Sequence, residues 1–246
     1  MERRSPHGLD GGSRLPEVKG PRLPEAEGVW WRPPMDRRRL RRRERAATAF
    51  TAVYITPFLV IGVGLLIIRP LLFPIALWSF AHAWVIPELF AHRGARVVFP
   101  LKSSGSDKPE RTALGLLGDM LDHAPRELML ETGLALERGA LGVWLVGEAG
   151  ALLVRRAGWR THCFCVRPTD PDLPRGDRIA HLLLALREDE VGFATVANHA
   201  FTGATWRVHR RLREAQRPAL EAAIEAATSD SPSAPSRSRA QVPSAS

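Results

Sequence analysis

Residues 37–91 have the sequence RRRLRRRERAATAFTAVYITPFLVIGVGLLIIRPLLFPIALWSFAHAWVIPELFA, which decides how the chain is built. The apolar part runs from Ala46 to Ile68, where Arg69 and Pro70 interrupt it, and residues 71–91 form a second apolar run. A helix of about 23 residues covers roughly the 30 Å hydrocarbon core of a bilayer. The sequence therefore predicts a transmembrane helical hairpin over residues 46–91, folded back at Arg69-Pro70.

Small side chains suggest which faces of the two helices meet, because helices in lipid pack where small residues let the backbones approach. One small-residue stripe is predicted on each helix. The stripes are Thr48, Ala52, Thr56 and Gly64 on the first, and Ala76, Ser79 and Ala83 on the second.

Arginine side chains set the expected orientation, since basic flanks of membrane helices stay in the cytoplasm. A hairpin returns the chain to its starting side, so both termini and the soluble domain are expected on the cytoplasmic side of the plasma membrane. The block is also expected to attract anionic lipid. This basic juxtamembrane segment, residues 36–45, contains Arg37, Arg38, Arg39, Arg41, Arg42, Arg43 and Arg45.

Two other topologies compete with the hairpin. In the first, only residues 46–68 span and the second apolar run lies along the interface, which would put the soluble domain outside. Pro74, His82, Pro87 and Glu88 in the second run favour this alternative. In the second, the segment is a cleaved signal; some 45 residues precede an apolar core longer than the 7–15 residues of a signal, which disfavours it.

Charge is concentrated before the membrane segment. Residues 1–46 carry 13 basic and 7 acidic side chains, a net of +6, whereas residues 92–246 carry 21 and 18, a net of +3. A domain that binds nucleic acid usually concentrates positive charge on itself. The bilayer is therefore the expected partner, together with a protein partner or a second copy of the chain, and nucleic acid is not expected.

The segments outside the hairpin divide into disordered and folded parts. Residues 1–35 and 229–246 are expected to be disordered, residues 92–111 to form a linker, and residues 112–228 to form a soluble α+β domain. Predicted helices cover 112–123, 125–132, 176–190 and 218–227, with Gly133 ending the second and Asp177 capping the third. Predicted strands cover 142–146, 151–155, 161–166 and 206–213. The fold class is thus a membrane-anchored α+β protein with an antiparallel sheet of three to four strands, covered by helices.

Ionisable residues inside the second apolar run are candidates for function, because such groups are costly in a membrane. His82 is expected either to respond to protons or ligand, or to bond Thr56 across the hairpin. Glu88 is expected to pair with His92 one turn later.

Three groups of side chains in the soluble domain are candidates for chemistry. Cys163 and Cys165 share one face of a strand and could bind metal or oxidise, but His162 points the other way, so a structural role is favoured. The carboxylates of "DPDLPRGD" (residues 170–177) favour a turn over a cation site, since no calcium-loop spacing is met. A hydrolytic site could form if His123, His181 and His199 converged with Asp177 or Cys163.

No catalytic motif follows from these spacings, and no cofactor or metal is predicted. The expected function is that of a membrane protein whose cytoplasmic domain binds a partner or senses a signal. The alternatives are a membrane-tethered enzyme that uses thiol and histidine side chains, and a membrane-linked nucleic-acid-binding protein.

Overall fold

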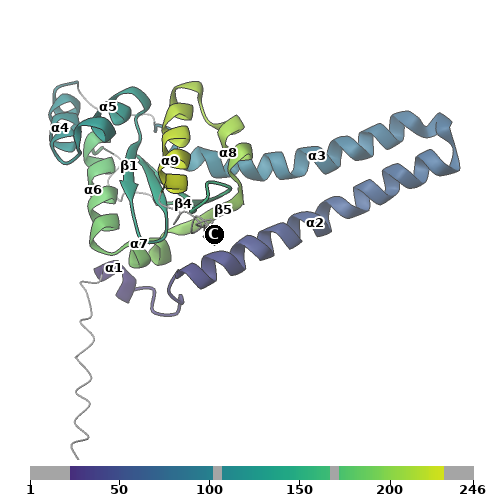
Figure 1. Cartoon of the computed structure of the whole chain (residues 1–246), viewed down its shortest axis with the longest axis horizontal. Coiled ribbons are helices and arrows are strands. Elements are labelled where there is room, and N and C mark those ends of the chain that lie inside the picture. The colour runs from purple at the N-terminus through teal and green to yellow at the C-terminus, as the bar shows by residue number, and fades with distance from the viewer. Residues whose placement is uncertain (1–22, 102–106, 167–171, 230–246) are drawn as a thin grey trace, which may run out of the picture.

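Two long helices run side by side out of an α+β body (Figure 1). The computed structural model describes residues 23–101, 107–166 and 172–229. Helix α2 (Arg37–Ile68) leads to the far end, and α3 (Phe73–Ala95) returns after Arg69 and the short turn η1 (Pro70–Leu72). The predicted pair of helices and the turn at Arg69-Pro70 are present. By length and composition, α2 and the segment Pro70–Val98 could each cross a membrane.

Helix α2 begins at Arg37, against the surface of the body, and not at the start of its apolar run. The Asp36 carboxylate caps it by accepting a hydrogen bond of 2.7 Å from the Arg39 backbone N–H, and Leu40 is fully buried. One uninterrupted helix therefore includes the arginine block and the apolar segment, and the body holds its first turns.

The contact between α2 and α3 confirms one predicted stripe. Ala76, Ser79 and Ala83 are buried on α3, and the Ser79 hydroxyl donates to the Phe58 carbonyl at 2.7 Å. On α2 the buried small residue is Gly62, where an added Cβ would lie 2.6 Å from the Phe80 ring. The stripe predicted on α2 is wrong, because its threonines and Ala52 are exposed. The contact face is turned away from them, and α2 accommodates a phenylalanine ring there.

The described residues form a five-stranded sheet with strand order β1-β2-β3-β4-β5, each strand antiparallel to the next. The prediction of three to four strands is therefore corrected. The strands are β1 (Ala135–Arg138), β2 (Val143–Gly147), β3 (Gly150–Val154), β4 (Arg160–Cys165) and β5 (Asn198–Ala204).

The strand predicted at 206–213 is also wrong, since Thr205–Arg211 forms helix α8. Val208 and Leu212 are both buried four residues apart, which suits one face of a helix. Trp206 is half exposed and lies off that face. The alternation of apolar and basic residues therefore misidentified a short helix as a strand.

Helices cover both faces of the sheet, as its apolar strands require (Figure 1). On one face, side chains including Trp144, Leu153 and Phe164 form a core with α4 (Asp107–Asp119), α5 (His123–Thr132), α6 (Arg175–Glu188) and α7 (Glu190–Val196). On the other face, side chains including Leu145 and Cys163 pack with α8, α9 (Arg217–Ser229) and the turn η2 (Arg96–Val98). The short turn η3 (Glu214–Gln216) precedes α9.

The flanking segments are partly described. Residues 1–22 and 230–246, where disorder was predicted, lie outside the described residues, as does part of the predicted linker. Residues 23–35 contain the short helix α1 (Pro24–Glu27). The Arg32 guanidinium donates to the Val196 carbonyl at 2.9 Å, and the Met35 backbone N–H donates to the Thr195 hydroxyl at 2.9 Å. These bonds attach the segment before α2 to α7. Helix α5 ends as predicted at Gly133, which has left-handed backbone geometry with φ of 71°.

Candidate functional site

The base of the hairpin lies against β5, the last strand of the sheet (Figure 1). Gly94 of α3 permits this approach, because a Cβ at this position would lie 2.7 Å from the Cβ of Phe201. An exposed strand edge is free to pair with other chains. Here the edge is covered by the two helices that leave the body, and the junction between hairpin and body contains the polar groups described next.

A chain of hydrogen-bonding side chains connects α2 to the sheet and back to α2. Glu44 Oε1 lies 3.0 Å from His162 Nε2 on β4. His162 Nδ1 lies 2.9 Å from the Thr202 hydroxyl on β5, which is 2.6 Å from His199 Nε2. His199 Nδ1 lies 3.4 Å from a guanidinium nitrogen of Arg43, the neighbour of Glu44. We call these five residues the junction array.

The donors and acceptors of the junction array fit two neutral imidazoles. If His162 donates from Nε2 to the Glu44 carboxylate, its Nδ1 accepts the Thr202 hydroxyl proton. His199 then donates from Nε2 to the Thr202 oxygen and accepts from Arg43 at Nδ1. Each imidazole gives one proton and receives one, which is the inventory of a neutral histidine.

Burial supports the neutral state. His162 is fully buried, and burial lowers its pKa, although the hydrogen bond to Glu44 and its charge act in the opposite direction. The pKa of His199 is lowered to about 3, first by burial and then by His162 and Arg43. The junction array therefore contains two uncharged rings at neutral pH, and a proton added to His199 would face the Arg43 guanidinium.

Glu44 of the junction array also forms an ion pair with Arg155, which lies outside the five residues of the array. Arg155 Nε lies 3.2 Å from Glu44 Oε1, and the two side chains are 15% and 18% exposed. Glu44 thus accepts from a guanidinium and an imidazole at once. Removing its carboxylate would leave both donors without this partner in a nearly dry place.

Glu44, His162 and Thr202 stand in the order of carboxylate, base and hydroxyl that hydrolases use. Two observations argue for a structural role. Thr202 is 8% exposed, and His199 Nε2 occupies the other side of its oxygen at 2.6 Å. A substrate carbonyl would have to displace His199 to reach the hydroxyl. The array is better suited to fixing α2 on the sheet.

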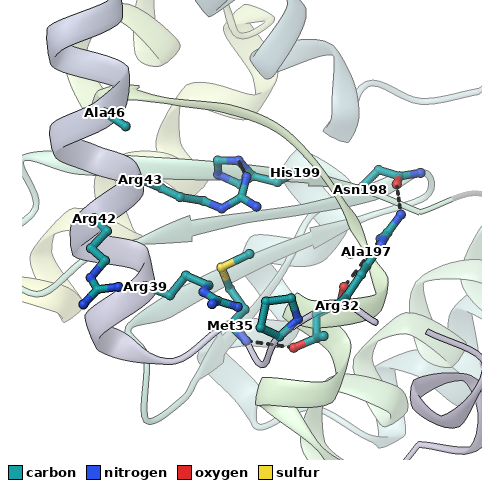
Figure 2. A pocket seen from close by; sticks show the side chains of 11 residues that line it. Arg32, Met35, Arg39, Arg42, Arg43, Ala46, Ala197, Asn198 and His199 are labelled. Carbon is teal, nitrogen blue, oxygen red and sulfur yellow. Dashed lines mark hydrogen bonds between the residues drawn. The ribbon is translucent and has the colours of Figure 1, made fainter. Parts of the chain in front are cut away.

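Two cavities lie beside the junction array. The first has a volume of about 520 Å³ and lies between α2, α7 and β5. Figure 2 shows Arg39, Arg42 and Arg43 on the α2 side, with Arg32 and His199 across the cavity. We call it the arginine cavity, because Arg32 and these three arginines line it.

The second cavity, of about 390 Å³, is mainly apolar and lies between α2, α3 and β5. Its lining includes Phe50, Phe90 and Phe201, and it shares Arg43 and His199 with the arginine cavity. We call it the phenylalanine cavity. The two cavities are neighbours that share Arg43, Ala46 and His199, with the basic one nearer the start of α2 and the apolar one nearer the hairpin tip.

A second set of contacts attaches α8 to α3. Glu88 is buried and accepts two hydrogen bonds from Arg211, at 2.9 and 2.7 Å. The predicted pairing of Glu88 with His92 is therefore replaced by a long-range ion pair. The Arg210 guanidinium lies 5.8 Å from the ring centres of both Trp84 and Trp206. Tryptophan and arginine thus gather where α3 meets the body.

The sequence-predicted membrane histidine has a local role. His82 Nδ1 lies 2.9 Å from the Trp78 carbonyl one turn earlier, and its ring stacks on Phe58 at 5.6 Å. The predicted bond to Thr56 is not made, because Thr56 donates to the Ala52 carbonyl of its own helix. His82 contributes to helix contact and does not join the junction array.

The two cysteines pack against the same core on one face of β4 but differ in burial. Cys163 is fully buried, and burial raises the pKa of its thiol; Cys165 is half-buried. A thiol kept protonated is a poor nucleophile and metal ligand. His162 lies on the opposite sheet face, as predicted. Among the described residues, no group of three histidine, cysteine, aspartate or glutamate side chains could hold a metal ion.

The predicted hydrolytic cluster is not assembled. His123 lies on α5 beside Glu127 at 3.6 Å, and His181 is exposed on α6. His199 alone joins a polar cluster, with partners that were not predicted. Asp170 lies outside the described residues, so the proposed turn there is not described.

The sequence pointed to Arg39, Arg42 and Arg43 but missed Glu44 and Thr202. One signal was available: Glu44 is the only acidic side chain within the arginine block of residues 37–45. No protein-family model, curated protein or solved structure matches this chain.

Proposed function

We propose that this chain is an integral membrane protein, anchored by the hairpin of residues 46–91, whose α+β body acts as a binding module at the cytoplasmic surface. The observation that carries the proposal is the exposure of apolar side chains along the hairpin. Only 6% of the most apolar stretch of α2 and 22% of that of the following helical segment is buried. Core helices of a soluble protein would be covered.

The exposed apolar surface is long and continuous. It includes Val53 at 69%, Ile67 at 78% and Leu71 at 87% exposure, from near the body to the tip. Soluble monomers rarely expose apolar patches larger than a few hundred Å². Two antiparallel helices satisfy their own backbone hydrogen bonds, which hydrocarbon demands. A bilayer is the solvent that suits this surface.

The arginine block supports a cytoplasmic body. Most of its guanidinium groups are exposed at the base of α2, next to the apolar segment, where the positive-inside bias acts. The tip carries Arg69 as its basic residue between the two helices. The imbalance between base and tip favours the base as the cytoplasmic end.

A binding role is favoured over catalysis by the state of the reactive groups. Cys163 is buried and protonated, and the Thr202 hydroxyl is held between two imidazoles. The open features at the junction are the two cavities. Concave sites with a few placed polar groups are the usual form of ligand sites.

Cysteine labelling of the full chain tests the topology. Leu71→Cys at the tip and Trp159→Cys on the body are placed separately in a Cys163→Ala, Cys165→Ala background; the two native side chains are 87% and 80% exposed, so they are matched. Spheroplasts of a bacterial host expressing each variant are treated with an impermeant maleimide, with and without lysis. Membranes are also washed with alkaline carbonate.

The proposal expects carbonate-resistant protein, a tip labelled in intact spheroplasts and a body labelled only after lysis. Labelling of the body in intact spheroplasts would put the body outside. A membrane-bound protein whose tip stays unlabelled both before and after lysis would have a hairpin that enters the bilayer but does not cross it. Extraction by carbonate would remove the membrane anchor altogether.

A further inference from the structure

The arginine cavity concentrates positive charge where a helix already has a positive end. The N-terminal turn of a helix favours anions and disfavours cations, yet Arg39, Arg42 and Arg43 lie in the first two turns of α2. Arg32 faces them across the cavity. The residues that line this cavity in the described part of the chain include no carboxylate. Such an arrangement is stabilised when an anion enters.

Two of the four guanidinium groups are held in place. Arg32 donates to the Val196 carbonyl at 2.9 Å and to the Asn198 side-chain oxygen at 3.2 Å. Arg43 is held beside His199. A third, Arg39, lines the cavity from the first turn of α2. A phosphate group supplies oxygens to several guanidinium groups at once.

The phenylalanine cavity continues the site towards the hairpin tip. From Arg43 to Phe50 the rise along α2 is about 10 Å, which exceeds the roughly 5–7 Å of one interfacial layer of a bilayer. If Arg43 lies at the phosphate level, Phe50 and Phe90 therefore lie in the hydrocarbon. The order from basic to apolar follows the order from headgroup to acyl chain.

We propose that the two cavities together bind one anionic glycerophospholipid of the surrounding bilayer. Its phosphate lies between Arg32, Arg39 and Arg42, and one acyl chain lies along Phe50 and Phe90. This inference rests on the proposed function, because a lipid reaches the site only if the hairpin is in a membrane. It names the ligand class that the binding module takes.

The test uses full-chain protein purified in a mild non-ionic detergent. Native mass spectrometry measures the fraction bound during titration with phosphatidylglycerol, and separately with phosphatidylcholine, inorganic phosphate and glycerol 3-phosphate. Two double variants are compared. Arg39→Gln with Arg42→Gln removes charge from the cavity lining, and Arg38→Gln with Arg41→Gln removes the same charge from the same helix outside it.

We expect the lining variant to weaken phosphatidylglycerol binding at least tenfold and the matched variant to change it less than threefold. Phosphatidylcholine should bind at least tenfold more weakly than phosphatidylglycerol in the unmodified protein. Equal losses of phosphatidylglycerol affinity in the two double variants would mean that binding depends on the charge of the helix surface and not on the cavity. Binding of glycerol 3-phosphate as tightly as the lipid would make the site a soluble-phosphate site. Either result overturns the proposal.

A steric variant keeps the test independent of charge and folding. Ala46 and Ala49 are both exposed on α2, but Ala46 lines both cavities and Ala49 lines neither. Ala46→Trp should abolish phosphatidylglycerol binding and Ala49→Trp should preserve it; equal binding by both overturns the proposal. If cysteine labelling confirms the topology but neither variant pair differs in lipid binding, the lipid site is wrong and the membrane anchor stands. Carbonate extraction of the protein would instead remove the anchor on which the site depends.

Discussion

Replacing Glu44 by alanine is the most direct perturbation of the contact between hairpin and body. In the native chain its carboxylate accepts from His162, which is fully buried, and pairs with Arg155, which is 15% exposed. The variant leaves an imidazole N–H and a guanidinium without this acceptor. It removes no apolar contact comparable in size, so the change in stability reports the polar contacts.

The expected loss is about 3 kcal/mol. An unsatisfied buried donor costs about 1–3 kcal/mol, and removing one partner of a buried ion pair costs about 3–5 kcal/mol. The two costs share one carboxylate and are not additive. Because Arg155 and Glu44 retain some exposure, water offsets part of the charge cost. For a chain of this size the loss corresponds to a melting point lower by about 6–12 °C.

Thermal unfolding of the full chain in detergent micelles, followed by tryptophan fluorescence, measures the shift. Glu44→Gln keeps an oxygen acceptor and should lose about half as much. Glu221→Ala is the matched control, because Glu221 pairs with His209 at 2.8 Å but is 64% exposed; such a pair contributes about 0.5 kcal/mol or less. If Glu44→Ala melts within 2 °C of Glu221→Ala, the junction array does not fix α2 to the sheet.

Three further outcomes follow from the same structure. The pKa of His199 is lowered to about 3 from an ordinary value of 6.5, so below pH 6.5 the unfolded chain binds a proton that the folded chain does not. Stability is therefore retained above pH 6.5 and falls below it by up to about 1.4 kcal/mol per pH unit. Melting temperatures measured from pH 7.5 to 5.0 should decline less in His199→Gln than in the native chain, and an equal decline would contradict a neutral His199 ring. Cys165 should react with a soluble maleimide in the native state, whereas Cys163 should react only on unfolding, because Cys163 is buried and the pKa of its thiol is raised. Mass spectrometry of single-cysteine variants measures the two labelling rates, and equal rates would contradict the burial of Cys163. Gly94→Ala should destabilise the chain by about 1–3 kcal/mol, because the added Cβ overpacks against Phe201 of β5. Gly115→Ala is the control: nothing lies within 4 Å of its added Cβ, so it should stabilise α4 by up to about 1 kcal/mol. Unfolding measurements that show no difference between the two variants would mean that α3 and β5 are not closely packed at Gly94.

Local patterns predicted those parts of the fold where one kind of periodicity dominates. The two apolar runs and their Arg69-Pro70 turn, the helix ended by Gly133, and the strands at β2, β3 and β4 all have such patterns. β1 and β5 do not. β5 has the sequence NHAFTGA, whose small and polar residues have little strand preference. It becomes a strand because β4, α2 and α3 surround it.

The candidate site was less predictable because its members are distant in the sequence. The contact between Glu44 and His162 joins residues 118 apart, and Thr202 meets both histidines only once β4 and β5 pair. The arginines were found because they form a block. Their arrangement around a cavity depends on Arg32, which α7 positions, and no local pattern indicates that.

Helix α2 runs from the body to the hairpin tip, with Pro57 inside it, and so couples the orientation of the hairpin to that of the body. Its apolar run rises about 33 Å, slightly more than a hydrocarbon core of about 30 Å, so a thinner membrane would favour a larger tilt than a thicker one. Since Leu40 is buried in the body and Asp36 caps the same helix, the body has to rotate with it. A difference of a few ångströms in bilayer thickness would thus change the orientation of the body's exposed surface relative to the membrane.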